Sequence, residues 1–287
     1  MVTITADMVK TLRDRTGAGM MECKTALAEA KGNFEEATTI LRKRGLATAA
    51  KKAGRATTEG LIGRRLSADC RAGTLVEVNC ESDFVARTPD FQQLVEDVLT
   101  EIERAGAGAT GSWLNDPNGP VQKRLAAAIA KLGENMAVPR FARYAGQGHV
   151  GQYIHMGGRI GVQVEFAVPP PGAAHEAFTT LVKEIAMQIA AASPSYVSRD
   201  FVPADVLASE KAIYRAQMES SGKPAAVIDK IVEGKLASFY AQAVLPDQPS
   251  IRDPKTTVAE MLASASRALG AEIAVTRFVR MKVGDGQ

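Results

Sequence analysis

The chain has 287 residues, of which 46% are hydrophobic and 23% are charged, and its formal net charge is +3. No stretch approaches the ~20 consecutive apolar residues that a membrane span needs, and residues 1–7 lack the basic and apolar regions of an export signal. The three cysteines are far apart and form no C-x-x-C pair, which argues against a disulfide framework or a zinc site. We therefore expect a cytoplasmic globular protein with a few compact units.

Short helices are predicted first, before residue 46. Thr5 can act as the N-cap of the first helix, and Gly17–Gly19 interrupt the helical pattern after it. The second helix stops at Gly32, Asn33 provides an N-cap for the third, and Gly45 is expected to end that helix. Three amphipathic helices of this length can close a small bundle.

Strand and helix patterns alternate in the next part of the chain. The expected elements are a helical linker at 46–58, strands at 61–66 and 74–79, a helix at 89–104, a Gly/Asn/Pro-rich loop at 105–119, a helix at 121–132 and extended segments up to Val168. Residues 91–98 resemble residues 178–185, and each segment follows a β-rich stretch at a similar distance. Two related α+β subdomains would produce this similarity, and so would chance resemblance between two amphipathic helices.

Residues 202–243 differ from the preceding segments because they contain two long helical patterns separated by Ser220–Pro224. This arrangement predicts an antiparallel helical hairpin that projects from the second subdomain. A helix at 258–269 and a strand at 272–283 are expected to follow it.

The sequence shows no residues arranged for chemistry. His149, His155 and His175 have no metal-ligand spacing, and there is no phosphate-binding loop, nucleophile elbow or zinc-protease motif. Gly157–Gly161 lead into a strand rather than a helix, so we interpret them as a turn. We therefore predict no catalytic residue, no cofactor and no metal.

Two apolar features are unusual. Met20 and Met21 are adjacent at a helix start, where neighbouring side chains point about 100° apart. If Met20 faces the bundle, Met21 is left exposed as an adaptable contact beside a basic surface, although both could also pack internally. Phe84 lies among the polar residues of segment 79–86, and the pattern alone favours a ring folded into the core.

Several segments carry a resemblance to a known family. Residues 12–27, which include the Met20–Met21 pair, resemble the N-terminal signature of the bacterial elongation factor Ts family, and residues 77–87 resemble its second signature. The segments Gly133–Asn135, Tyr153–His155 and Arg159–Val162 are similar to further family stretches and occur in the expected order. The resemblance covers nearly the whole chain.

The resemblance implies a guanine nucleotide exchange factor for elongation factor Tu, with no enzymatic activity of its own. It also implies an α+β fold in which a three-helix, ubiquitin-associated-like domain precedes a core of two related α+β subdomains with an inserted antiparallel helical hairpin. The corresponding boundaries are 1–55 for the three-helix domain with its linker, 56–145 for the first core subdomain, 146–201 and 244–287 for the second, and 202–243 for the hairpin. In the family this hairpin serves dimerisation, which leaves open a homodimer or a two-plus-two complex.

The resemblance also assigns the contacts with the partner. In the family an Asp-Phe loop reaches the GTPase near its magnesium site and promotes release of GDP. The matching partner-binding residues in this chain are Met20, Met21, Ser82, Asp83, Phe84, Val85, Met136 and His155. Ser82 departs from the usual threonine, and some members continue beyond the last strand into a C-terminal helical module that this sequence, ending at Gln287, is expected to lack.

Two other classes of function are compatible with parts of the sequence. Residues 1–55 hold 11 Lys and Arg against 6 Asp and Glu, which would suit a ribosome- or RNA-associated module, although direct nucleic-acid binding is not expected. An unrecognised enzyme would need titratable groups that converge in one pocket, and the sequence offers no such cluster.

Overall fold

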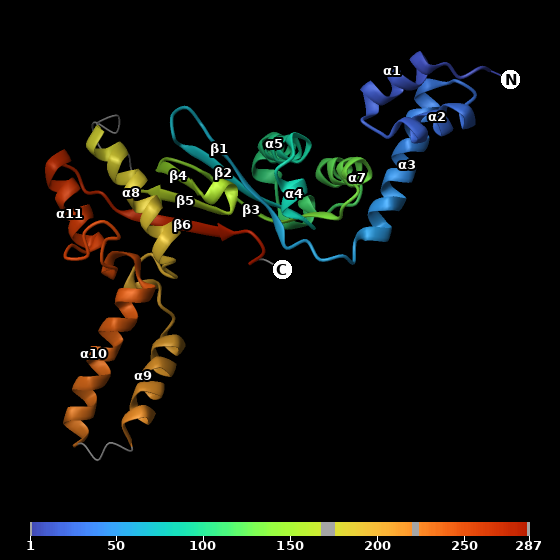
Figure 1. The fold of residues 1–287 in the computed structure, drawn as a ribbon. Coiled ribbons are helices and arrows are strands. Elements are labelled where there is room, and N and C mark those ends of the chain that lie inside the picture. The colour runs from blue at the N-terminus through green and yellow to red at the C-terminus, as the bar shows by residue number, and fades with distance from the viewer. Residues whose placement is uncertain (1, 168–175, 220–223, 286–287) are drawn as a thin grey trace.

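The computed structural model describes residues 2–167, 176–219 and 224–285 and has a mixed α+β architecture, which confirms the predicted class (Figure 1). The α-helices are α1 (Ala6–Thr16), α2 (Met20–Glu29), α3 (Phe34–Lys52), α4 (Asp83–Ala86), α5 (Pro89–Ala105), α6 (Gly111–Leu114), α7 (Pro120–Leu132), α8 (Glu176–Ala192), α9 (Ala204–Glu219), α10 (Ala225–Ala243) and α11 (Val258–Leu269). The strands are β1 (Glu59–Leu66), β2 (Ala72–Cys80), β3 (Met136–Ala145), β4 (His149–His155), β5 (Ile160–Phe166) and β6 (Val275–Lys282). Single 3-10 turns are η1 (Gly106–Gly108), η2 (Met156–Gly158), η3 (Arg199–Phe201) and η4 (Leu245–Asp247).

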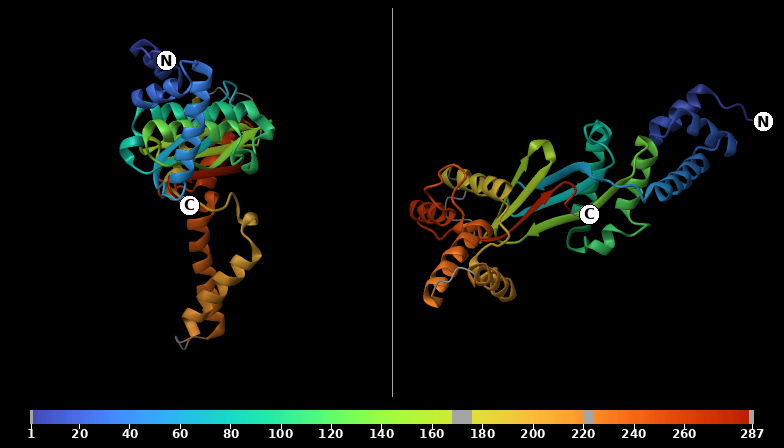
Figure 2. Two further views of the ribbon diagram at one scale, coloured as in Figure 1. Left: turned by 90° about the vertical axis from the view of Figure 1, so that its right-hand side faces the viewer. Right: turned by 60° about the horizontal axis from the view of Figure 1, so that its bottom comes forward.

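Helices α1, α2 and the first half of α3 form a small bundle at one end of the molecule (Figures 1 and 2). Thr5 and Asn33 cap α1 and α3 through their side chains, and Gly17 ends α1 with a φ of 68°, as predicted. The prediction that Gly45 ends α3 is wrong, because the helix continues to Lys52. A Cβ at Gly45 would lie 3.6 Å from the backbone oxygen of Ala126 in α7. Packing of α3 against α7 therefore outweighs the low helix propensity of glycine.

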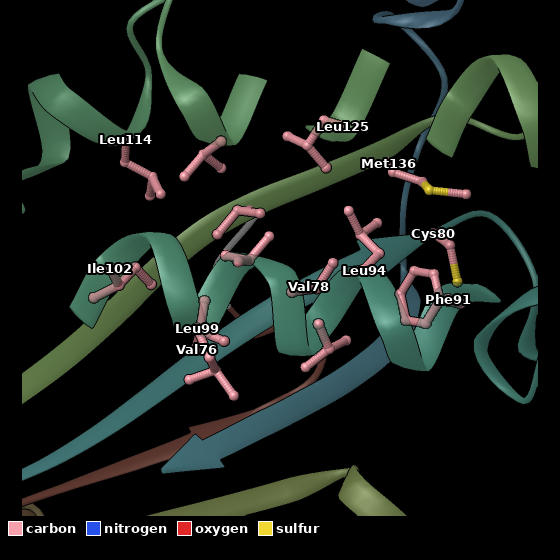
Figure 3. Packing of buried hydrophobic residues seen from close by; sticks show 14 of the residues in the cluster. Val76, Val78, Cys80, Phe91, Leu94, Leu99, Ile102, Leu114, Leu125 and Met136 are labelled. Atoms are coloured by element: carbon pink, nitrogen blue, oxygen red, sulfur yellow. The ribbon is translucent and has the colours of Figure 1, made fainter. Parts of the chain in front are cut away.

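Strands β1, β2 and β3 form an antiparallel sheet in that order, and α5 and α7 cover one of its faces. Side chains of β2 alternate between the two faces, and both faces are buried. Val76 and Val78 pack with Phe91 and Leu125 in the core beneath the helices (Figure 3). The predicted loop at 105–119 contains the short helix α6, whose Leu114 closes one end of this core.

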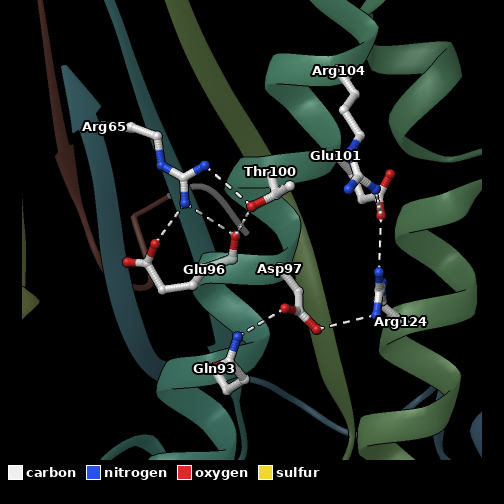
Figure 4. Close-up of polar contacts among 8 residues, drawn as sticks. All are labelled: Arg65, Gln93, Glu96, Asp97, Thr100, Glu101, Arg104 and Arg124. Carbon is white, nitrogen blue, oxygen red and sulfur yellow. Dashed lines mark hydrogen bonds and ion pairs between the residues drawn. The ribbon is translucent and has the colours of Figure 1, made fainter. Parts of the chain in front are cut away.

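Helix α5 is also fixed by charged side chains on its outer surface (Figure 4). Arg65 of β1 pairs with Glu96 at 2.7 Å and with Glu103 at 2.8 Å. On the opposite side, Arg124 of α7 donates to Glu101 at 3.1 Å. These contacts keep α5 in a fixed position between the sheet and α7. Helix α4 ends at Ala86, shortly before α5 begins at Pro89.

Strands β4, β5 and β6 form a second antiparallel sheet in that order, covered by α8 and α11. Its core includes the rings of Phe166 and Phe178, which meet edge to face with centroids 5.6 Å apart. The two sheets are joined through the fully buried Glu77 of β2. Its carboxylate accepts hydrogen bonds from Arg140 at 2.7 Å and from the backbone of Gly284, just after β6, at 2.8 Å.

Helices α9 and α10 lie side by side and project away from the two sheets (Figures 1 and 2). They match the helical patterns predicted at 202–243, while residues 220–223 between them lie outside the described residues. Arg215 and Asp229 form an ion pair between the two helices at 2.6 Å. Among the described residues, no helix is long and apolar enough to cross a membrane.

Candidate partner-binding surface

Phe84 is the most exposed large hydrophobic side chain in the surface around α4, with 80% of the residue accessible to solvent. The expectation from pattern alone, a ring folded into the core, is therefore wrong. Helix α4 is a single turn between two caps: Ser82 accepts from the backbone of Val85 at 3.4 Å, and Thr88 caps α5 by accepting from Phe91 at 3.2 Å. Phe91 fills the core, so the turn directs Phe84 outward.

Asp83 lies beside Phe84 on the rim of an open hollow of about 530 Å³. Its carboxylate pairs with Arg87 at 2.7 Å; the Arg87 side chain is largely accessible to solvent and that of Asp83 partly so. The hollow is lined by Glu59, Gly60, Leu61, Asp83, Ala86, Arg87, Met156, Gly157 and Arg159. A hydrogen bond from Arg159 to Glu59 is the main cause that raises the pKa of Arg159. The surface therefore combines an exposed ring with fixed charges of both signs.

Met156, which is not among the residues predicted from the sequence, faces the same hollow from the turn between β4 and β5. The residue is 67% exposed and has a φ of 50°, a left-handed conformation that a non-glycine residue rarely adopts. Gly157 and Gly158, which follow it, also have positive φ values. An exposed methionine in this backbone conformation makes Met156 a candidate contact residue. The sequence feature that could have drawn attention to Met156 is an apolar residue followed by two glycines.

His155 is exposed at the end of β4, directly before Met156. Its Nδ1 lies 3.1 Å from the hydroxyl oxygen of Tyr153, and the two rings stack with centroids 5.8 Å apart. This contact fixes the imidazole at the tip of the β4–β5 hairpin. The structure thus brings the tip that carries His155 and Met156 to the hollow beside Asp83, which makes one surface from two sequence motifs.

Two further motifs meet beneath this surface, at the end of β2. The carboxylate of Glu134 accepts hydrogen bonds from the backbone of Glu81 at 3.1 Å and from the backbone and hydroxyl of Ser82 at 3.0 and 2.5 Å. The carboxylate of Glu81 in turn accepts from the backbone of Asn135 at 2.6 Å. This hydrogen bond is the main cause that lowers the pKa of Glu81, and the charge of Arg55 acts in the same direction.

Met136, which the family resemblance assigns to the partner contact, does not present its side chain on this surface, and its contact with the partner stays a prediction. The residue is 4% exposed and packs in the core cluster with Phe91 and Leu94. As the first residue of β3 it pairs with Cys80, and its side chain points to the face that α5 and α7 cover (Figure 3). Val85 is likewise partly buried against this core, so Asp83 and Phe84 are the outward-facing residues of the turn.

Met20 and Met21 are both exposed, at 52% and 70%, in the first turn of α2. The expectation that Met20 faces the bundle is wrong, and so is the alternative that both pack internally. The core of the bundle contains Leu12, Cys23 and Leu27, and neither methionine belongs to it. The pair follows Ala18, which lines one pocket together with Lys131 at the end of α7, so these methionines lie near the junction of the three-helix bundle with α7.

The remaining titratable groups show no arrangement for metal binding in the part of the chain that the structure describes. His149 is half-buried against the ring of Phe178, with centroids 4.9 Å apart, and burial lowers its pKa. It therefore has the environment of a packing residue. His175 lies outside the described residues.

The comparisons with known proteins agree with one another. A family model described as elongation factor TS matches residues 81–285. Elongation factor Ts of Nitratidesulfovibrio vulgaris (strain DP4) is 44% identical over 289 residues, which cover 99% of this chain and 97% of that protein. Elongation factor Ts of Nautilia profundicola is 44% identical over 100% of this chain and 94% of its own length. Elongation factor Ts of Clostridium perfringens is 42% identical over 99% of this chain and 94% of its own length.

Proposed function

The chain belongs to the elongation factor Ts family, and we propose that it uses the turn around Asp83 and Phe84 to weaken the hold of its partner on GDP. Elongation factor Ts is the nucleotide exchange factor for elongation factor Tu in translation elongation and has no chemistry of its own. Because the chain belongs to this family, the alternative hypothesis of an unrecognised enzyme no longer applies. In this proposal the chain binds elongation factor Tu·GDP in the cytoplasm, and residues 82–85 then contact the part of the GTPase that holds Mg²⁺ and the nucleotide.

The exposure of Phe84 carries this proposal. The ring contributes little to the stability of the isolated chain, because 80% of the residue remains in water. It is nevertheless held on a short turn with a cap at each end, and its neighbour Asp83 lines the same hollow as a second exposed apolar residue, Met156. Exposed apolar side chains held in fixed positions on one surface are typical of a surface that a partner covers.

The magnitude of exchange shows that Phe84 does not act alone. Accelerating GDP release ~10⁴-fold needs about 5.5 kcal/mol of preferential stabilisation of the nucleotide-free partner. Burial of one phenylalanine ring supplies about 1.5–3 kcal/mol. The remainder has to come from other contacts and from disturbance of the magnesium ion, which bridges the nucleotide phosphates to the GTPase. By reciprocity, the factor and the nucleotide then weaken the binding of each other.

The methionine pair supplies a second contact in this proposal. Met20 and Met21 are exposed on a basic unit, and flexible methionine side chains adapt to a partner surface. The excess of positive charge in residues 1–55 favours an acidic surface on the partner and would steer association. We assign this patch to docking and the Phe84 turn to release of the nucleotide.

The hairpin of α9 and α10 is proposed to determine the oligomeric state. Among its described residues, the hairpin carries exposed apolar side chains such as Ile213 and Val227, and only a few side chains are buried. A second copy of the chain, in a homodimer or in a two-plus-two complex with the GTPase, would cover these residues.

Removal of magnesium tests where Phe84 acts. Release of fluorescent GDP from elongation factor Tu is measured with the wild-type chain and with Phe84→Ala, first in Mg²⁺ and then after chelation. If the turn acts on the magnesium site, the two proteins differ strongly in Mg²⁺ and converge once the metal is gone. A difference that chelation leaves unchanged would place the action of Phe84 elsewhere.

A further inference from the structure

We propose that Glu134 is a positioning residue for exchange: it contacts no nucleotide and sets the direction in which the Phe84 turn meets the partner. This inference rests on the proposed function of Phe84. It arises because Glu134 makes three hydrogen bonds to the two residues that precede the turn, although the two segments are remote in the sequence.

The backbone at the end of β2 explains why the turn needs an external support. The ladder between β2 and β3 ends with the pair Cys80 and Met136. The backbone N–H groups of Glu81 and Ser82 therefore have no ladder partner, and each must find another acceptor. One carboxylate oxygen of Glu134 accepts from both, at 3.1 and 3.0 Å. The strand end is thus tied to the residue that stands just before β3.

The other oxygen of Glu134 holds the N-cap of α4. It accepts from the Ser82 hydroxyl at 2.5 Å, and that same oxygen of Ser82 accepts from the backbone of Val85 at 3.4 Å. Glu134 therefore orients the side chain that begins the turn carrying Phe84. A charged acceptor gives a shorter and stronger hydrogen bond than a neutral one, which favours a single orientation of the hydroxyl.

A reciprocal contact makes the support rigid. Glu81 accepts from the backbone of Asn135 at 2.6 Å, so each strand end holds the other. The Asn135 side chain donates to the backbone oxygen of Arg55 at 2.8 Å, and Lys52 at the end of α3 donates to the backbone oxygen of Gly133. The turn is therefore fixed against both the sheet and the segment that leads from the three N-terminal helices. A functional side chain held by such a supporting shell needs little reordering when the partner binds.

A double-mutant cycle separates positioning from a purely structural role. Glu134→Ala is prepared alone and in the Phe84→Ala background, and each full-length chain is assayed for maximal stimulated release of fluorescent GDP, for the concentration at half-maximal effect and for unfolding in urea. Glu134→Ala alone should lower the maximal rate by about 10- to 100-fold, the usual effect of losing a supporting shell or of a small misplacement. In the Phe84→Ala background it should lower the rate less than about twofold, since no ring remains to be positioned.

Two further variants complete the design. Glu134→Gln keeps the shape and one carbonyl oxygen for the backbone donors, so it should retain more exchange than Glu134→Ala and serves if the alanine variant does not fold. Glu101→Ala is the matched control, because Glu101 is also a shielded carboxylate held by arginines, on α5 (Figure 4). It should lower stability and leave the maximal rate of exchange unchanged.

The outcomes are distinguishable. The positioning role would be overturned if folded Glu134 variants stimulated GDP release at the wild-type rate. It would also be overturned if Glu134→Ala lowered the maximal rate by the same factor with and without the Phe84 ring. Either result would leave the proposed function intact. Wild-type exchange by Phe84→Ala alone would contradict the proposed function itself, and the positioning role would fall with it.

Discussion

Replacing Phe84 with alanine should slow exchange while leaving the isolated chain almost as stable as before. Because the residue is 80% exposed, its truncation removes little buried surface and should change the free energy of unfolding by no more than about 0.5 kcal/mol. Phe91, later in the same segment, is fully buried in the core. Phe91→Ala should therefore cost about 3–5 kcal/mol. The same chemical change thus has a very different expected effect on stability at the two positions.

The effect of Phe84→Ala on exchange follows from the burial of the ring in the complex. Loss of about 1.5–3 kcal/mol of contact should slow stimulated GDP release by roughly 10- to 150-fold. Phe201→Ala is the matched surface control, because Phe201 is 64% exposed in η3, at the base of the hairpin and away from the Asp83 hollow. It should leave both stability and exchange unchanged.

Urea unfolding of the three variants and stopped-flow release of fluorescent GDP provide the two measurements. Phe84→Ala should unfold with the wild-type midpoint and stimulate release slowly. A Phe84→Ala chain that loses about 3 kcal/mol of stability, or that stimulates release at the wild-type rate when folded, would refute the reasoning from exposure.

Three further predictions follow from the same structure. Met156→Asn should slow stimulated exchange and should keep or raise the free energy of unfolding in urea, because asparagine tolerates a φ of 50° better than methionine. Lower stability with normal exchange would contradict a contact role for Met156. Glu77→Gln should lower the free energy of unfolding by about 1.5–3 kcal/mol, because the buried carboxylate accepts from Arg140 and Gly284, and an unchanged urea midpoint would argue against this link between the sheets. Replacing residues 204–243 with a short linker should change the mass found by light scattering and leave some exchange, whereas a folded deletion of unchanged mass without exchange would reverse the role given to the hairpin.

The elements that the sequence predicted well are those with strong local signals. Helix α5 begins at Pro89 after the Thr88 cap, and α11 spans Val258–Leu269 with a capping box at Thr257 and a left-handed glycine at its end. Each signal lies within a few residues of the helix terminus, so it can be recognised without tertiary information. The division of the chain at residues 55, 145 and 201 stays a prediction.

The errors arose where packing between distant segments decided the outcome. Gly45 has the local signal of a helix end, but contact with α7 continues the helix. The burial of the Met136 side chain was not foreseen either, because it follows from the position of this residue at the start of β3, and contact of Met136 with the partner stays a prediction. The exposure of Phe84 depends on which residues fill the core beneath it, and Phe91 occupies that place. No local pattern could supply these facts.

The support of the turn by Glu134 was beyond sequence reasoning for a similar reason. The segments 81–82 and 134–135 were recognised as separate motifs, and only the antiparallel pairing of β2 with β3 places them in contact. Met156 was missed because a methionine before two glycines suggests only a turn, and its exposure and positive φ are properties of the folded chain.

The central claim is that this chain accelerates the release of GDP from elongation factor Tu. The direct measurement is the release of fluorescent GDP from the purified GTPase, in excess unlabelled nucleotide, with and without the chain. The rate should rise with the concentration of the chain and then saturate, because an exchange factor acts through a complex with the nucleotide-bound partner. A rate of release that is the same with and without the chain, at concentrations where the two proteins bind, would contradict it.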